Sequence, residues 1–525
     1  MTPPGGRLMA WIHRPDVRAL LWWCLPALIV GLTLRGALWV KMPHAFYHPD
    51  SDQVFDTWRS LLHGSLHFHE KKTPLGPLLY CLPPLLRLPV LPAIALVQHL
   101  LGLGIVLMIG TLVAGSFTRW HLFIVPVTLL VAANPILLWY EHVALPETFY
   151  VFSIVATALT GLLYCRKPDT PRLIALGAAL YLTAGFRPEG KLFCLFGIAL
   201  AVCATWGEWK KMRNSAGSLL ILTALCIHFD RTAQSGSLLY SNVAHLTPEK
   251  LRSAPGFTEA HQDYFSNLRE KWAVTPAGRI ARERKQLIRF LRDYLAARNG
   301  GKEVSDKAVE RLCGRIGAEV CLRNAHRLPA LSLAKFRCAL GNRAAEDFGP
   351  DWLYRKQTES LAGDFDEADR LATRAESSRE FVQIAYGRDF DSRQELENHL
   401  RQLYRPFIPD WLSAWQERYS AAILAWRLPD RPLDRGTLSG MPYLYIAATA
   451  GLLAMAVRDR RLRTYHFLWL GMLLFMAFVL TLTGSNLGRF RVGFESFWFL
   501  YAFGLLDVVL GLLVPKRRRN PVAQV

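Results

Sequence analysis

Long apolar segments occupy both ends of this 525-residue chain and constrain its fold more than any other feature. Seven of them contain 17 to 25 residues: 20–40, 92–116, 122–138, 145–164, 441–457, 465–483 and 494–514. An α-helix rises about 1.5 Å per residue, so these lengths match the hydrocarbon thickness of a bilayer, about 30 Å. Three further segments, 173–185, 192–206 and 216–229, are shorter. We therefore predict an all-α polytopic membrane protein with about ten transmembrane helices.

The charged residues divide the chain into three parts. Residues 229–436 contain 34 Lys/Arg and 29 Asp/Glu, whereas the other 317 residues contain only 28 and 13. We predict an N-terminal membrane domain at 1–228, a water-exposed domain at 229–436 and C-terminal membrane helices at 437–525. The middle domain should be mainly helical, because apolar residues recur at spacings of three and four within 279–298, 305–326, 364–384 and 392–404.

Most basic residues of the membrane part lie in alternate connections between the apolar segments and at the two termini. These connections hold 18 Lys/Arg but only four Asp/Glu, within 7–18, 119, 166–172, 208–213, 458–463 and 516–519. Cytoplasmic connections carry such an excess, so we predict that both termini are cytoplasmic and that 229–436 is extracytoplasmic. We expect segment 20–40 to remain as an anchor. The pI near 9.7 then records orientation in membrane lipid, and we expect no nucleic-acid partner.

The first outer loop, 41–91, concentrates charged groups near the hydrocarbon boundary, where they are costly and therefore candidates for function. It contains Asp50, Asp52 and Asp56, then a stretch with helical spacing, then Lys71-Lys72-Thr73-Pro74. Carboxylates beside lysines suit a site that removes a proton from an acceptor while it holds an anion. The alternative is that Asp50 or Ser51 only caps the following helix.

The other outer loops carry a second set of charged candidates. These are Glu147, Arg187, Glu189, Arg489 and Arg491. Structural alternatives exist for several of them: Arg491 and Glu495 have the spacing of a helical ion pair, and Arg187 and Glu189 could pair with each other. For Arg35, inside the first apolar segment, we expect the guanidinium to reach up to the interface by snorkelling.

In their order and on one face, these motifs resemble the GT-C superfamily of polytopic glycosyltransferases that use polyprenyl-phosphate sugars. The likeness is greatest to the protein O-mannosyltransferase and lipid A aminoarabinose-transferase group. It rests on Pro49-Asp50, Lys72-Thr73-Pro74-Leu75, Leu145-Pro146-Glu147, Arg187-Pro188-Glu189-Gly190 and Arg489-Phe490. Two positions depart from the family: Asp50-Ser51 stands where Asp-Glu is common, and Lys71 replaces an acid associated with a metal in some relatives.

The resemblance implies an inverting transfer of a sugar from a polyprenyl-phosphate donor to a glycan, lipid or protein acceptor. It implies Asp50 as the base, with Asp52 as the second choice, and Glu147 as a residue that orients the acceptor or Lys72. Its implied substrate-binding residues are Lys72, Arg187, Glu189, Arg489 and Arg491. It names no cofactor with certainty and no metal ligands, although a divalent metal stays an open alternative. The implied location is a bacterial inner (plasma) membrane.

Two rival functions share the same charges. The first is a non-enzymatic transporter or assembly protein for lipid-linked saccharides, in which the charges guide a lipid head group. The second is a polymerase or ligase that uses pyrophosphate-linked donors.

The loop histidines His67 and His69 could bind metal, but a loop of this kind is more typically solvent-exposed.

Overall fold

The structure, a computed structural model, describes residues 15–46, 51–62, 64–68, 73–229, 235–274, 280–332, 441–460, 462–483 and 487–513, with 391, 392, 394, 395, 398 and 399. Helix accounts for 83% of the structure, and the described residues contain no strand. The prediction of an all-α chain is confirmed.

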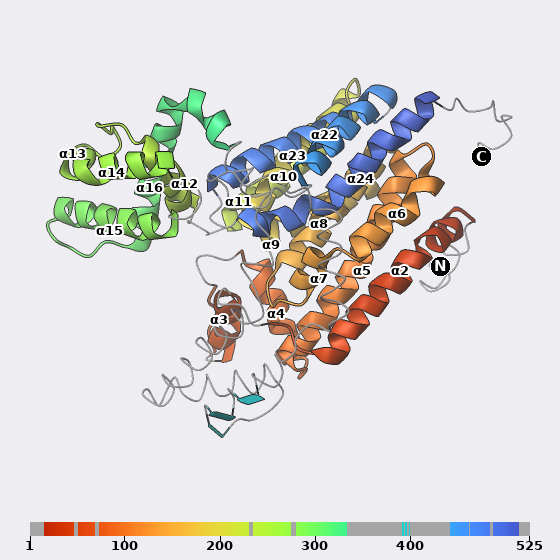
Figure 1. The fold of residues 1–525 in the computed structure, drawn as a ribbon, viewed down its shortest axis with the longest axis horizontal. Helices are drawn as coiled ribbons and strands as arrows, with labels where there is room; N and C mark the ends of the chain where they lie inside the picture. Colours follow the sequence, from red (N-terminus) through yellow and green to blue (C-terminus); the bar gives the residue numbers. More distant parts are fainter. Residues whose placement is uncertain are drawn as a thin grey trace.

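The main body is a bundle of long, roughly aligned helices (Figure 1). Its members are α2 (Pro15–Lys41), α5 (Val90–Ser116), α6 (Trp120–Ala132), α8 (Glu147–Arg166), α9 (Thr170–Phe186), α10 (Lys191–Ala204), α11 (Trp209–Phe229), α22 (Met441–Arg458), α23 (Arg463–Thr483) and α24 (Leu487–Leu513). Among the described residues, four stretches are long and apolar enough to cross a membrane: Arg18–Val40, Val90–Ser116, Glu147–Arg166 and Gly493–Leu513. Trp120–Ala132 and Leu444–Arg458 are apolar but shorter. The chain is therefore consistent with a membrane protein, and each segment predicted as a span, except 122–138, overlaps one long helix.

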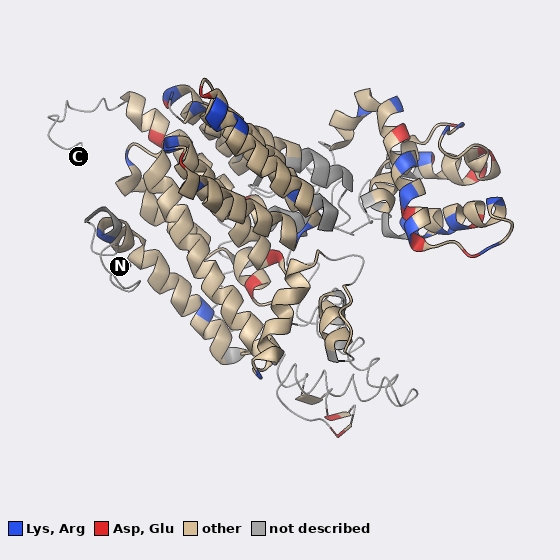
Figure 2. Cartoon of the chain, turned by 180° about the vertical axis from the view of Figure 1, so that it is seen from behind, with Lys and Arg blue, Asp and Glu red and all other residues tan. Residues whose placement is uncertain are grey.

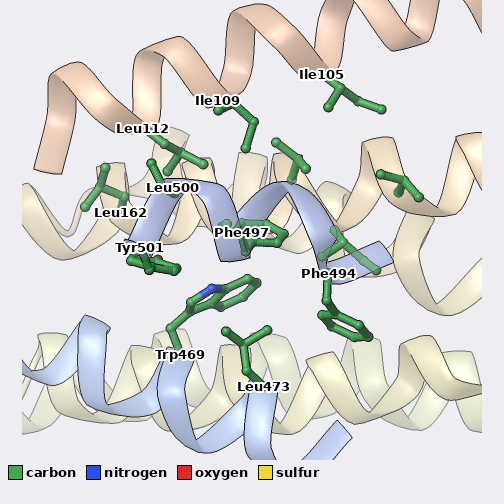
Figure 3. Packing of buried hydrophobic residues seen from close by; sticks show 14 of the residues in the cluster. Ile105, Ile109, Leu112, Leu162, Trp469, Leu473, Phe494, Phe497, Leu500 and Tyr501 are labelled. Carbon is green, nitrogen blue, oxygen red and sulfur yellow. The ribbon is translucent and has the colours of Figure 1, made fainter. Parts of the chain in front are cut away.

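Residues from the two ends of the sequence share one hydrophobic core. Trp469 of α23 is fully buried and lies 4.9 Å, between ring centroids, from Phe497 of α24. On the side of α24 away from Trp469, its side chains face Ile105 and Ile109 of α5 (Figure 3). At Gly451 of α22 an added Cβ would collide with the α24 backbone. Small residues permit such close approach between membrane helices, so the C-terminal helices complete the N-terminal bundle.

One predicted span is wrong in its extent. The apolar segment 122–138 was expected to be a single helix, but α6 ends at Ala132 and a short helix, α7 (Pro135–Glu141), follows. Pro135 lacks the N–H that a continuous helix would need, and the side chain of Asn134 accepts a hydrogen bond from the Leu137 amide at 3.2 Å, as an N-cap does. This break gives α7 its own start and places Glu141 at the end of α7.

Two short helices within residues 41–91 lie together at one end of the bundle (Figure 1). They are α3 (Asp52–Leu62) and α4 (Leu75–Leu85), and they share a small core with the start of α5 and with residues 143–145. The rings of Phe55 and Tyr80 meet edge to face at 5.5 Å. An isolated β-bridge joins Phe46 to Val143. The loop before Glu147 thus belongs to the same small core as α3 and α4.

The predicted middle domain is helical in the part that the structure describes. It contains α12 (Ser235–Val243), α14 (Gln262–Val274), α15 (Ile280–Arg298) and α16 (Asp306–Arg323) around a separate core, and residues of both charge signs lie along its helices (Figure 2). The helices expected at 279–298 and 305–326 are confirmed, with Gly300 and Gly301 between them at φ 67 and 79°. The helix expected at 364–384 lies outside the described residues, as does most of that at 392–404. The domain boundaries themselves stay predictions.

The opposite end of the bundle is tied together by one buried carboxylate. Asp507 of α24 accepts hydrogen bonds from the amides of Thr118 and Arg119 at 2.9 Å and pairs with Arg458 of α22 at 2.6 Å. Nearby, the guanidinium of Arg166 at the end of α8 donates to the Gly115 carbonyl. Three of the basic positions predicted to share one membrane side therefore lie at the same end of the bundle.

Candidate functional site

An ion cluster with one buried carboxylate lies at the bundle end that carries α3 and α4. Arg187 donates from one terminal nitrogen to Glu147 at 2.8 Å and from Nε to Glu189 at 3.3 Å. The Glu147 side chain is 1% exposed, compared with 14% for Arg187 and 21% for Glu189. The guanidinium carbon also lies 5.7 Å from the ring centroid of Tyr150, one turn into α8. Two carboxylates share one cation, so these three groups carry a net charge of −1 when ionised.

Local sequence explains how each member of this cluster is placed. Glu147 is the first residue of α8, where the helix dipole favours an acid. Arg187 directly follows α9, and the chain then turns through a 3-10 helix, η2 (Pro188–Gly190). An added Cβ at Gly190 would collide with the Thr183 carbonyl, so the turn folds back onto the last turn of α9 only with glycine there. The arginine-proline-glutamate-glycine turn thereby directs Arg187 towards α8.

The start of α4 packs against residues that precede the two sides of the ion cluster in the sequence, Pro146 and Gly185. A Cβ at Gly76 would lie 3.4 Å from Pro146, which precedes Glu147, and a Cβ at Gly185 of α9 would press against Leu75. Thr73 is 4% exposed. The segment that follows Lys72 in the sequence therefore lies between the Glu147 loop and α9, although Lys72 itself lies outside the described residues.

The start of α3 is connected to the same loop. The Ser51 hydroxyl donates to the Ala144 carbonyl at 2.7 Å, and the Gln98 amide of α5 donates to the Leu145 carbonyl at 2.8 Å. Asp50 lies outside the described residues. Asp52 is the first residue of α3, and its side chain is not among those described. The structure thus brings the flank of the acidic motif to the Glu147 loop without placing either aspartate side chain.

The last motif, Arg489-Phe490, lies at the start of α24, which approaches the first turns of α8. A Cβ at Gly493 would lie 3.3 Å from Ile154 and 4.0 Å from Tyr150, the same ring that faces Arg187. Arg489 and Arg491 lie in the first turns of α24, and their side chains are outside the described set. Described residues in or beside these motifs, Ser51, Leu75, Arg187 and Gly493, therefore lie near the loop before α8 or near its first two turns.

The described residues contain no group of three or more His, Cys, Asp or Glu side chains that could hold a metal ion. His67 is exposed, and His69 lies outside the described residues. The structure therefore offers no described ligand set for the divalent metal that the sequence left open.

The expectation that Arg35 snorkels is wrong. Arg35 is 2% exposed, and its guanidinium lies 2.5 Å from Glu141, whose other oxygen lies 3.0 Å from His99. Neither Glu141 nor His99 is among the site residues predicted above. The available signal was a histidine within an otherwise apolar segment, since ionisable groups in a membrane helix need a partner in the bundle.

No family model, no curated protein and no solved structure matches the chain. Its function therefore has to be inferred from the residues and the geometry described above.

Proposed function

We propose that this protein is a membrane glycosyltransferase of the GT-C type. It transfers a sugar from a polyprenyl-phosphate-linked donor to a hydroxyl of a glycan, lipid or protein acceptor, with inversion at the anomeric carbon. The observation that carries the proposal is the Glu147–Arg187–Glu189 cluster. It lies beside Leu75 of α4, the loop anchored by Ser51 and the first turns of α24, and its Glu147 carboxylate is withdrawn from water. Charges placed this way in a membrane protein are expensive and mark functional sites.

In the proposed reaction Asp50 acts as the base, with Asp52 as the second candidate. The acceptor oxygen attacks the anomeric carbon as its proton passes to the aspartate. The bond between that carbon and the phosphate oxygen breaks, and its electron pair remains on the lipid phosphate. A positioned carboxylate typically contributes about 100- to 10,000-fold to such a step. The tie between Ser51 and Ala144 supports a base beside the Glu147 loop.

The lipid phosphate gains negative charge in the transition state, so the site needs fixed positive charge rather than a strong acid. We assign this role to Lys72 and Arg489, with Arg491 as a further candidate. Arg187 is held by two carboxylates, which supports a different role. It would keep Glu147 ionised and oriented towards the acceptor or Lys72, while Glu189 completes the cluster.

The proposed orientation follows from α8. This helix begins at Glu147 and ends at Arg166, and its 20 residues span about 30 Å, the thickness of bilayer hydrocarbon. Arg166, Arg119 and Arg458 lie at the end opposite to the ion cluster. We propose ten spans, cytoplasmic termini, a site on the extracytoplasmic face of a bacterial inner membrane, and an extracytoplasmic 229–436 domain that shapes access for the acceptor.

The test is sugar transfer in isolated membranes. Asp50→Asn and Lys72→Ala should each reduce transfer of a tritiated sugar from its polyprenyl phosphate at least 100-fold with protein level unchanged. Asp169→Asn, at the opposite end of the bundle, is the matched control and should leave the rate unchanged. If wild-type protein binds the lipid-linked saccharide without turnover, the transporter alternative replaces the transferase. If only pyrophosphate-linked donors are consumed, the polymerase or ligase alternative does so.

A further inference from the structure

Four polar side chains form one hydrogen-bonded chain inside the bundle, separate from the Glu147 cluster. Arg35 of α2 lies 2.5 Å from Oε1 of Glu141 in α7, and Oε2 of that carboxylate lies 3.0 Å from Nδ1 of His99 in α5. The other ring nitrogen of His99 lies 3.0 Å from Nδ1 of His142. None of the four residues is more than 5% exposed. This set is called the Arg35–His142 chain below.

The surrounding helices are shaped around this chain. Arg35 also donates to the carbonyls of Gly31 and Ala132, both at 3.1 Å, so α2 is linked to the end of α6. At Gly102 of α5 an added Cβ would collide with the Glu141 carboxylate and the Arg35 guanidinium. A buried ion pair is costly to desolvate and very costly to leave half-paired. The pair therefore holds α2, α5 and α7 in one arrangement rather than adding only to stability.

The backbone next to the Arg35–His142 chain forms hydrogen bonds with residues 46 and 51 of the first outer loop. The Phe46 amide donates to the His142 carbonyl at 2.7 Å, and the Ala144 amide donates back to the Phe46 carbonyl at 2.7 Å. On the far side of Asp50 in the sequence, the Ser51 hydroxyl donates to the Ala144 carbonyl at 2.7 Å. Residues 142–144 thus contact both positions, Phe46 and Ser51, that bracket the proposed base.

The ring of His142 connects the Arg35–His142 chain of side chains to the backbone hydrogen bonds that residues 142–144 make with Phe46 and Ser51. These backbone hydrogen bonds are called the clamp below. Burial lowers the pKa of His142, neighbouring His99 lowers it further, and the backbone of Met42 and His44 acts in the opposite direction. The neutral ring has one donor and one acceptor nitrogen, so its hydrogen bond with His99 fixes how the ring faces the loop. The His142 ring also meets the Phe46 ring edge to face at 5.8 Å.

We infer that Glu141 and His99 are positioning residues, which fix residues 142–144 and through them both anchor points of the loop that carries Asp50. The inference rests on the proposed function for its catalytic consequence, whereas the anchoring itself does not depend on it. Neither residue needs to touch substrate. Because a shift of about 1 Å in a catalytic group costs about 100-fold in rate, loosening the clamp should lower kcat more than it raises KM.

The first experiment measures anchoring without any substrate. Hydrogen–deuterium exchange on the full chain in lipid nanodiscs would follow peptides that contain the Phe46 and Ala144 amides. Glu141→Gln should speed exchange there at least 10-fold. The double variant Arg35→Met/Glu141→Gln leaves no unpaired charge and should insert normally, yet show the same faster exchange. Asp507→Asn, which alters an equally buried carboxylate paired with arginine at the other end, is the matched control and should leave these amides unchanged.

The second experiment measures kinetics with an undecaprenyl-phosphate sugar carrying a tritium label. His99→Leu should lower kcat about 10- to 100-fold with the KM for the donor within twofold, and His99→Gln, whose amide can both donate and accept, should recover most of the rate. Unchanged exchange at Phe46 and Ala144 in the double variant would overturn the inference, and so would faster exchange with a normal kcat. Full activity in Asp50→Asn would instead reject the proposed base, so the two failures are distinguishable.

Discussion

Arg187, which follows the last residue of α9, donates a hydrogen bond over 2.8 Å to Glu147, the first residue of α8. The two positions are 40 residues apart in the sequence, and each belongs to a short motif that looks unremarkable alone. Their contact closes the end of the α8–α9 helical pair. It also gives the proposed site a carboxylate whose charge is matched by a partner from another helix.

The energy of this contact can be isolated by a double-mutant cycle. Arg187→Ala leaves the buried Glu147 carboxylate with less compensation, so we expect it to lower the free energy of unfolding by about 3 kcal/mol. Arg187→Ala combined with Glu147→Gln should cost less than the sum of the single changes, with a coupling of about 1 to 3 kcal/mol. Denaturant-induced unfolding in detergent, followed by tryptophan fluorescence, provides the measurement. Strict additivity would contradict the pairing.

Glu189 should matter less to stability than Glu147. Its distance to Arg187 is longer, 3.3 Å, and its side chain is 21% exposed compared with 1% for Glu147. Water therefore screens this pair more strongly, and we expect Glu189→Gln to cost no more than about 1 kcal/mol in the same unfolding assay. If Glu189→Gln lowered the free energy of unfolding more than Glu147→Gln does, the more buried ion pair would not be the stronger one, which would contradict this prediction.

Gly190 is expected to be intolerant of any side chain. An alanine there would place its Cβ into the carbonyl of Thr183, and backbone atoms cannot move aside cheaply. We expect Gly190→Ala to destabilise the protein by about 1 to 3 kcal/mol or more and to displace Arg187 from Glu147. Gly217→Ala in α11 is the control, because no atom lies within 4 Å of its added Cβ. Gly190→Ala should therefore melt at a lower temperature than Gly217→Ala. Equal melting temperatures would contradict the close approach of Gly190 to Thr183.

In the middle domain, Glu319 of α16 should make a pH-dependent contribution to the free energy of unfolding. Burial raises its pKa, but hydrogen bonds from the Arg252 amide and from the amide and hydroxyl of Ser253, with the charge of Arg323, outweigh this and hold the pKa at about 2. A carboxyl whose pKa is lower in the folded state stabilises the fold above its unfolded pKa. That stabilisation is lost as pH falls from about 4.5 towards 2.

The corresponding measurement compares wild type with Glu319→Gln. At pH 6 the variant should be less stable by about 1.5 to 3 kcal/mol, the usual contribution of hydrogen bonds to a charged group, and the difference should shrink at pH 3. Glu303→Gln, at an exposed loop position, is the control and should show little change at either pH. A difference that grows on acidification would have the wrong sign.

Sequence predicted the helices of this protein well because apolar length and helical periodicity are local properties. Segment 145–164 became α8 within two residues at each end, and 279–298 became α15. The break after Ala132 depended on local chemistry too, but Asn134 and Pro135 sit inside an apolar run that length alone reads as continuous.

Pairings between helices could not be predicted in the same way. Arg35 and Glu141 are 106 residues apart, and nothing in either local pattern says that α2 and α7 meet. The same holds for Arg187, which the sequence paired with Glu189 but not with Glu147. Packing between helices selects these partners, and only the three-dimensional arrangement reveals it.

The central claim is transfer of a sugar with an aspartate base beside the Glu147 loop, and the Asp50→Asn variant tests it most directly. Isolated membranes that contain equal amounts of wild type or variant would receive tritiated sugar on a polyprenyl phosphate, and label in the acceptor fraction would be counted. The account predicts transfer by the wild type and a loss of at least 100-fold in the variant, with donor binding retained. Equal transfer by both proteins would contradict it.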